Sequence, residues 1–217
     1  MPRIPLISDF YDQYLDDQDS AGLIAKVSRH YTLGTLQRLT GHDNCKVRRA
    51  AVLAIGFVGD YSENHTLGRA LLDDDRTTRI LAENAIRSVW ARAGSEDERQ
   101  QLKVIISLNT AEQHEEAIDR ATEMIRKAPW FAEAWHQRAV AQFKLCNFSE
   151  AIRDCHQTLE INPYHFTAAA SMGKAYLRLD NHVSALQSFR RALRLNPNLD
   201  GIRAQVVRLA KMVEDNK

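Results

Sequence analysis

The chain has 217 residues, of which 44% are hydrophobic and 26% are charged, and its net charge is +1. These values are ordinary for a globular domain, and the near-neutral charge excludes a global electrostatic attraction to nucleic acid or to an anionic membrane. Five prolines and nine glycines are few for this length, while Ala, Leu and Arg are abundant, and these three residues lose little rotamer freedom in a helix.

The first twenty residues predict neither a secretion signal nor a membrane anchor, because five aspartates interrupt their apolar residues. No apolar run elsewhere in the sequence reaches the length that a bilayer span requires. The three cysteines, Cys45, Cys146 and Cys155, are odd in number and widely spaced, which is typical of reduced thiols inside a cell. We therefore expect a cytoplasmic protein.

Residues 1–19 form an acidic arm that also carries Phe10, Tyr14 and Leu15. Two interpretations are open. The arm is either a short helix that packs these three side chains on the helix pair that follows, or a segment that docks in a basic groove of this chain or of a neighbouring copy. Amphipathic chain ends usually dock locally, which favours the first interpretation.

A weak repeat, the N-terminal repeat, runs through residues 20–95. It pairs Asp43 with Asp74, Val47 with Thr78, Arg48 with Arg79, Ala51 with Ala82 and Ala54 with Ala85, all at one constant offset. The pattern resembles short HEAT-like repeats of the phycobilin lyase type, although its period is shorter than is usual for HEAT units. The resemblance implies helix pairs at 32–40 with 46–58 and at 63–72 with 77–92, preceded by a half unit at 20–30. We expect the matched Asp and Arg residues to stabilise repeat stacking rather than to catalyse a reaction.

A stronger repeat, the C-terminal repeat, fills the second half of the chain, and three columns of residues share its period. They are Pro129, Pro163 and Pro197; Ala117, Ala151 and Ala185; and Ile118, Ile152 and Leu186. Each unit is predicted to be two antiparallel helices that approach closely at the alanines. In the second unit these helices are 132–145 and 149–160, with Ser149 as an N-cap and Asn162 and Pro163 ending the second helix.

These columns resemble the tetratricopeptide repeat. The third unit, at 166–199, has Gly173, Tyr176, Ala185, Phe189, Ala192 and Pro197 in signature positions. The second keeps Trp135, Ala139, Ala151 and Pro163, but has Cys155 and Thr158 where an aromatic residue and an alanine are usual. The first, about 98–131, keeps only Ala117, Ala121 and Pro129.

The predicted fold is all-α. It is a right-handed α–α superhelix of HEAT-like helix pairs at 20–95, three tetratricopeptide units at 96–199, and a capping helix at 200–217. One face of this last helix carries Ile202, Val206, Leu209 and Met212, as expected of a helix that closes such an array. The junction at 95–98 has no proline and Ser95 suits an N-cap, so we expect one continuous superhelix.

The resemblance implies that the first helix of each tetratricopeptide unit lines a concave groove that binds a peptide. Carried over by position, this predicts a groove with an apolar stretch followed by a basic end, which suits an acidic partner. Glu133 occupies a further position of this kind. The groove set is Leu102, Ile106, Asn109, His136, Gln137, Val140, Phe143, Lys144, Lys174, Leu177, Arg178 and Arg208.

The best-known ligand mode of this family clamps a chaperone's C-terminal carboxylate with Lys and Asn side chains at set groove positions. The corresponding positions here lack that pattern, which disfavours this mode. They hold Leu102, Ile106, Gln137, Thr167 and Ser171.

No motif for catalysis, a cofactor or a metal is recognisable in the sequence. The segment 56–59 has two glycines but lacks the lysine and the preceding strand of a phosphate-binding loop. Cys146, Cys155, His156 and His165 are close in sequence, but Cys155 is predicted on a core face and His156 beside it points elsewhere. Ordinary thiol packing is therefore favoured over zinc binding.

The sequence thus predicts a non-catalytic scaffold or adaptor that binds a protein or peptide, and open solenoid ends also permit self-association. Two alternatives remain. One is an assembly chaperone or lyase-like accessory protein, by resemblance to the HEAT-like family. The other is nucleic-acid binding through the HEAT-like helices, which the near-neutral charge disfavours. Its phosphate contacts are Arg48, Arg49, Arg76, Arg79, Arg87 and Arg92.

Overall fold

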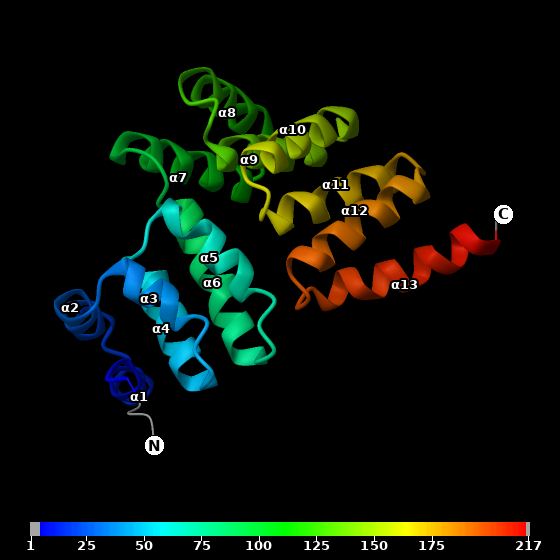
Figure 1. Cartoon of the computed structure of the whole chain (residues 1–217). Coiled ribbons are helices and arrows are strands. Elements are labelled where there is room, and N and C mark those ends of the chain that lie inside the picture. The colour runs from blue at the N-terminus through cyan, green and yellow to red at the C-terminus, as the bar shows by residue number, and fades with distance from the viewer. Residues whose placement is uncertain (1–4, 216–217) are drawn as a thin grey trace. The chain divides into compact units, whose positions relative to one another are not determined.

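The structure, a computed structural model, describes residues 5–215, and this range is all-α as predicted, with thirteen α-helices and one short 3-10 helix. The chain divides into two compact units, 1–92 and 93–217, and each is described by itself (Figure 1). Within the described range, no helix is both long enough and apolar enough to cross a bilayer.

The N-terminal unit is centred on two helices, α4 and α6, which pack along each other. Small residues allow their close approach: a Cβ at Gly56 of α4 lies 2.8 Å from the Cβ of Ala85 of α6. The elements of this unit are α1 (Ile7–Asp17), α2 (Ser20–His30), α3 (Leu33–Leu39), α4 (Cys45–Val58), η1 (Tyr61–Glu63), α5 (Asn64–Ala70) and α6 (Arg76–Ala91).

The offset of the N-terminal repeat recurs in the hydrogen bonds of this unit. The N-cap residues of α4 and α6 are Asn44 and Asp75, and each side chain accepts a backbone N–H of the helix that it begins. Arg48 donates to the carbonyls of the two residues before Asn44, and Arg79 donates to the carbonyls of the two residues before Asp75. Each repeat therefore has a side-chain N-cap and an arginine at equivalent positions.

Residues 1–4 of the acidic arm lie outside the described range. The rest of the arm contains α1, which packs on α2 and α4. Ile7 and Tyr11 are buried, and the Tyr14 ring meets Phe57 edge to face at 5.7 Å. The backbone N–H of Ile7 donates to the hydroxyl of Tyr31. This is the local docking that the first interpretation expects. The expectation that Leu15 is buried is wrong, because the buried face follows residues 7, 11 and 14, and Leu15 is 52% exposed.

The C-terminal unit consists of consecutive antiparallel helices, each packed on the next. Its second helices begin at His114, Phe148 and His182, which are evenly spaced at the period of the C-terminal repeat. Ser149 lies inside α10 rather than at its N-cap, since that helix begins at Phe148. The helices are α7 (Glu96–Thr110), α8 (His114–Lys127), α9 (Ala132–Lys144), α10 (Phe148–Ile161), α11 (Phe166–Arg178), α12 (His182–Leu195) and α13 (Asp200–Asp215).

The turn inside each helix pair recurs at the same period. Glu112, Cys146 and Asp180 adopt left-handed backbone conformations, with φ values of 59°, 63° and 54°. The residue after each of them donates its N–H to a carbonyl near the end of the preceding helix, as in the Schellman motif. The same backbone turn thus forms from three different residues.

Tight packing in the third repeat and the closing helix positions the candidate site. At Gly173 of α11, an added Cβ lies 2.5 Å from the ring of Phe189 of α12, so the helices meet where only glycine fits. The predicted apolar face of α13 is confirmed: Leu209 is buried on α12, and Ile202, Val206 and Met212 pack beside it.

Candidate functional site

The groove set lies on α7, α9, α11 and α13, but it does not form one exposed surface. Ile106, Lys144, Lys174, Arg178 and Arg208 are exposed. The prediction that Leu102 contacts a bound peptide is wrong. The side chain of Leu102 is 1% exposed, and both α8 and α9 pack on the helix that carries it.

Two polar members of the groove set bind each other. The Asn109 side-chain amide donates to the carbonyl oxygen of Gln137 at 3.0 Å and to its side-chain oxygen at 3.1 Å. These bonds connect the end of α7 to the middle of α9. In this arrangement Asn109 holds two first helices together.

An aromatic and cationic cluster lies where α9, α10 and α11 meet. The Phe143 ring lies 5.4 Å from the ring of Phe148, edge to face, and the Arg178 guanidinium lies 4.7 Å from the centroid of Phe148. Phe148 was not among the predicted site residues. Its position follows from the chain reversal after α9, which places the first residue of α10 beside the last turn of α9.

A pocket of about 360 Å³ lies beside Lys174 and Leu177 of α11. It is apolar apart from Lys174 and Gln205, and it is bounded by α12 and by the start of α13. The closing helix therefore contributes to the candidate site. The other lining residues are Phe189, Leu199, Gly201 and Ile202.

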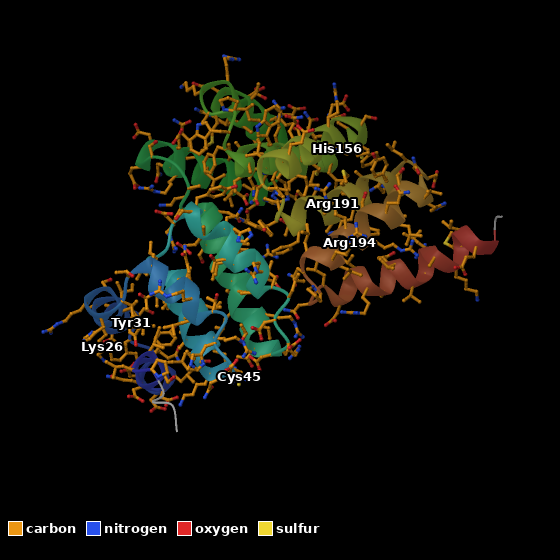
Figure 2. The ribbon with its side chains drawn as sticks, viewed as in Figure 1. Lys26, Tyr31, Cys45, His156, Arg191 and Arg194 are labelled. Atoms are coloured by element: carbon orange, nitrogen blue, oxygen red, sulfur yellow. The ribbon has the colours of Figure 1, made fainter. Side chains whose placement is uncertain are left out.

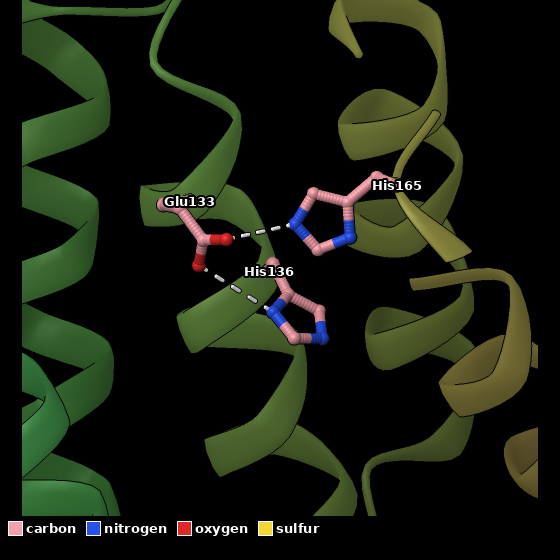
Figure 3. Close-up of side chains that lie close together, drawn as sticks. All are labelled: Glu133, His136 and His165. Carbon is pink, nitrogen blue, oxygen red and sulfur yellow. Dashed lines mark hydrogen bonds and ion pairs between the residues drawn. The ribbon is translucent and has the colours of Figure 1, made fainter. Parts of the chain in front are cut away.

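A buried polar cluster connects α9 to α11 (Figure 3). His165 is fully buried and is the N-cap residue of α11, where its Nδ1 accepts the N–H of Ala168 at 3.1 Å. Because Nδ1 is an acceptor, the neutral ring carries its proton on Nε2. This Nε2–H donates to Oε1 of Glu133 at 3.0 Å.

His136 completes this cluster. Its Nδ1 lies 3.7 Å from Oε2 of Glu133, and its ring centroid lies 4.5 Å from that of His165. Burial lowers the pKa of His165, which keeps that ring neutral. Burial alone raises the pKa of Glu133, but the two imidazoles beside its oxygens hold that pKa well below its usual range. The cluster is thus an ionised carboxylate between two histidines.

The sequence analysis grouped His165 with Cys146, Cys155 and His156, but the structure places His165 beside Glu133 and His136 instead. Its neighbours in sequence are elsewhere: Cys155 is buried, with a pKa raised to about 12 by burial, and His156 is exposed on α10 (Figure 2). The useful signal was the repeat period. His165 follows Glu133 by slightly less than one period of the C-terminal repeat, so stacking brings them together, and His136 is one helical turn after Glu133.

The arginines of the N-terminal unit mostly bind groups of that unit. Arg48 forms a two-pronged ion pair with Asp73 at 2.7 and 2.8 Å, and Arg49 forms one with Asp75. Arg49 also holds the pKa of Asp75 well below its usual range. Arg92 donates to two backbone carbonyls. These guanidinium groups hold the repeats together, which leaves few of them for phosphate contacts.

Comparison with known proteins finds similarity to one family in part of the C-terminal unit. Residues 132–165 match the family model described as tetratricopeptide repeat. The chain is 27% identical over 145 residues to a TPR repeat-containing protein of Rhizobium etli. The aligned region covers 67% of this chain and 70% of that protein. The chain is also 29% identical over 104 residues to Hsp70-Hsp90 organizing protein 1 of Glycine max, covering 46% of this chain but 18% of that protein.

A solved structure has the same fold. The first TPR of Spaghetti (RPAP3), bound to the HSP90 peptide SRMEEVD, superposes with a TM-score of 0.53 at 22% identity, covering 56% of this chain and 96% of that one. This protein is therefore an all-helical repeat protein. It carries a tetratricopeptide repeat at residues 132–165, and the helix pairs on either side of that repeat share its period.

Proposed function

We propose that this protein is a non-catalytic scaffold or adaptor that binds an extended segment of another protein along α9 and α11. The observation that carries this proposal is the apolar pocket beside Lys174, formed by α11, α12 and α13. Such a pocket holds one large apolar side chain of a bound peptide. A repeat array supplies the rest of the contact as a rigid surface, which lowers the entropic cost of binding.

The preferred segment is acidic. Lys174 lies at the pocket, and Lys144 and Arg178 are exposed on the last turns of α9 and α11. These cations steer and orient a peptide with Asp or Glu beside its apolar anchor, while the anchor supplies most of the affinity. Arg178 is already positioned over Phe148, which reduces the freedom that it loses on binding.

This mode differs from a carboxylate clamp. The five clamp positions of this chain carry no cation, and one of them, Leu102, is in the core. The HSP90 peptide of the RPAP3 structure is that protein's ligand. For this chain we propose recognition of a side chain and its flanking charges, without a requirement for a free C-terminus.

The remaining finer assignments are also proposals. We assign residues 20–95 to HEAT-like repeats, because a cap, an arginine and a helix pair recur in them at one constant offset. These repeats extend the surface that is available to partners. We place the protein in the cytoplasm and propose that open ends of the helix stack support self-association.

The test is a selection of peptides from a random library displayed on phage, followed by affinity measurements with the selected peptides. We expect sequences with Asp or Glu flanking one large apolar residue. Lys174→Glu/Arg178→Glu should weaken their binding by at least about tenfold, since two attractions become repulsions.

The matched control is Arg190→Glu/Arg194→Glu, which makes the same charge change at exposed positions of α12. This variant should keep wild-type affinity. Selection of basic or neutral peptides, or equal losses for both variants, contradicts the proposed surface. Peptides that bind only with a free C-terminus contradict the proposed mode.

A further inference from the structure

We propose that Glu133, His136 and His165 form a binding site for Zn²⁺ that joins the second repeat to the third. Each residue offers one ligand atom, and these three atoms all lie within 4.8 Å of one another. Two imidazole nitrogens and one carboxylate oxygen are a ligand set that zinc uses in proteins, with a water molecule as the fourth ligand.

The spacing of the ligand atoms fits a small cation. Ligands bonded to zinc at about 2.1 Å in a tetrahedron lie about 3.4 Å apart. Oε1 of Glu133 lies 3.0 Å from Nε2 of His165, and Oε2 of Glu133 lies 3.7 Å from Nδ1 of His136, so each imidazole is near that distance from one of the two carboxylate oxygens. The three ligand atoms are at most 4.8 Å apart, so side-chain rotations that bring them closer by up to about 1.4 Å give the tetrahedral spacing.

His136 supplies a second, independent observation. Both of its ring nitrogens are buried, and neither has a hydrogen-bond partner among the described residues. Buried polar atoms without partners are rare, and each needs a physical reason. A zinc ion bonded to Nδ1, on the side of the ring that faces Glu133, supplies a partner to one of the two nitrogens.

Coordination changes the tautomer of His165. Its Nε2 now carries the proton that Glu133 accepts. When Nε2 binds zinc, the proton of the neutral ring moves to Nδ1, where Oγ1 of Thr167, 3.0 Å away, accepts it. The N–H of Ala168 then loses the acceptor that caps α11. The proposal therefore predicts a local change at Ala168 that occurs only with metal.

The ligand set also determines which metals bind. Imidazole favours Zn²⁺, Ni²⁺ and Cu²⁺, whereas Mg²⁺ and Ca²⁺ require several oxygen ligands, and this cluster has one carboxylate. Because Glu133 and His136 lie on α9 while His165 begins α11, the ion ties adjacent first helices together. Zinc thus stiffens the same two helices that carry the proposed peptide surface.

The test uses the full chain, stripped of metal with a chelator and titrated with ZnCl₂ in a calorimeter. We expect one Zn²⁺ per chain, and a rise in Tm of about 5–10 °C at a zinc concentration one hundred times Kd. MgCl₂ and CaCl₂ should give no rise. Co²⁺ in place of Zn²⁺ should give the visible absorption of a tetrahedral site.

His136→Gln should weaken zinc binding by more than about tenfold, since it removes a ligand that makes no other hydrogen bond. His165 is buried and caps a helix, so His136→Gln and Glu133→Gln carry the test instead. The controls are His156→Gln and Cys146→Ser, two exposed potential ligands outside the cluster, and both should bind zinc as the wild type does.

Hydrogen exchange at the Ala168 amide gives a readout that a purely structural cluster does not. It should become faster when zinc is added, while the rest of the C-terminal unit exchanges more slowly. Absence of zinc binding, or binding that survives both ligand variants, overturns the proposal. Neither result affects the peptide surface, whose test depends on Lys174 and Arg178.

Discussion

The two units of this protein stack helices with different chemistry. In the N-terminal unit, ion pairs such as Arg48 with Asp73 connect one repeat to the next, and an arginine closes each repeat. In the C-terminal unit, alanines and Gly173 bring the helices together, and left-handed turns close each pair. The N-terminal and C-terminal repeats, which have different periods, thus both stack their helices. The N-terminal repeat relies more on ion pairs, and the C-terminal repeat relies more on close apolar packing.

The largest expected effect comes from a substitution that disrupts the apolar packing of the C-terminal unit. Phe189→Ala should lower the free energy of unfolding by about 3–5 kcal/mol, because Phe189 is fully buried against Gly173 and its loss leaves a cavity. Urea unfolding measures this change. Val183→Ala, at a position 53% exposed on the same helix, is the control and should change it by less than about 0.5 kcal/mol.

The close approach of helices in each unit is tested with alanine. Gly56→Ala and Gly173→Ala should each destabilise by about 1–3 kcal/mol, since the new Cβ meets Ala85 at 2.8 Å in one unit and Phe189 at 2.5 Å in the other.

The matched controls are Gly34→Ala and Gly201→Ala, helical positions where an added Cβ meets nothing within 4 Å. Both should stabilise by up to about 1 kcal/mol, because alanine favours a helix. A Gly56→Ala variant as stable as the wild type would show that the first unit packs less tightly than the second.

Acid should weaken the two units at different pH values. His165 has a lowered pKa in the folded protein, so below its unfolded pKa of about 6.5 the unfolded chain binds more protons and stability falls with pH. Asp75 also has a lowered pKa, but its unfolded pKa is about 3.9, so the stability that it contributes is lost only as pH falls below that value.

The stability of each unit is measured between pH 7 and pH 5 by urea unfolding, with amide hydrogen exchange used to distinguish the two units. The C-terminal unit should lose stability first, and His165→Asn should remove the loss if the variant folds. Equal losses in the two units over this range contradict the assignment of a neutral His165.

The smallest expected effect concerns the left-handed turns that close each helix pair of the C-terminal unit. Glu112→Gly, Cys146→Gly and Asp180→Gly should each stabilise the C-terminal unit by about 0.5–1 kcal/mol, because glycine adopts a positive φ without the steric cost of a Cβ. Thermal unfolding measures the gain. The alanine variants at the same positions should show none.

The candidate site was only partly predictable. Sequence position placed Lys174, Leu177 and Arg178 on one helix, but it also placed Leu102 on the surface, since periodicity does not fix how far α8 and α9 cover α7. Phe148 and the pocket wall at Ile202 were missed for the same reason. Both belong to elements outside the first helices, and their contacts depend on how neighbouring helices pack.

The sequence by itself determined the all-α fold, the two repeat periods and the positions of most helices. It could do so because caps, turn residues and small packing residues act over a short stretch of chain and recur at fixed spacing. Only the tertiary structure decided which helix face is covered, where α1 docks, and that Glu133, His136 and His165 meet. These outcomes depend on the rotation and offset of one helix against the next, which arise from the packing of many side chains at once.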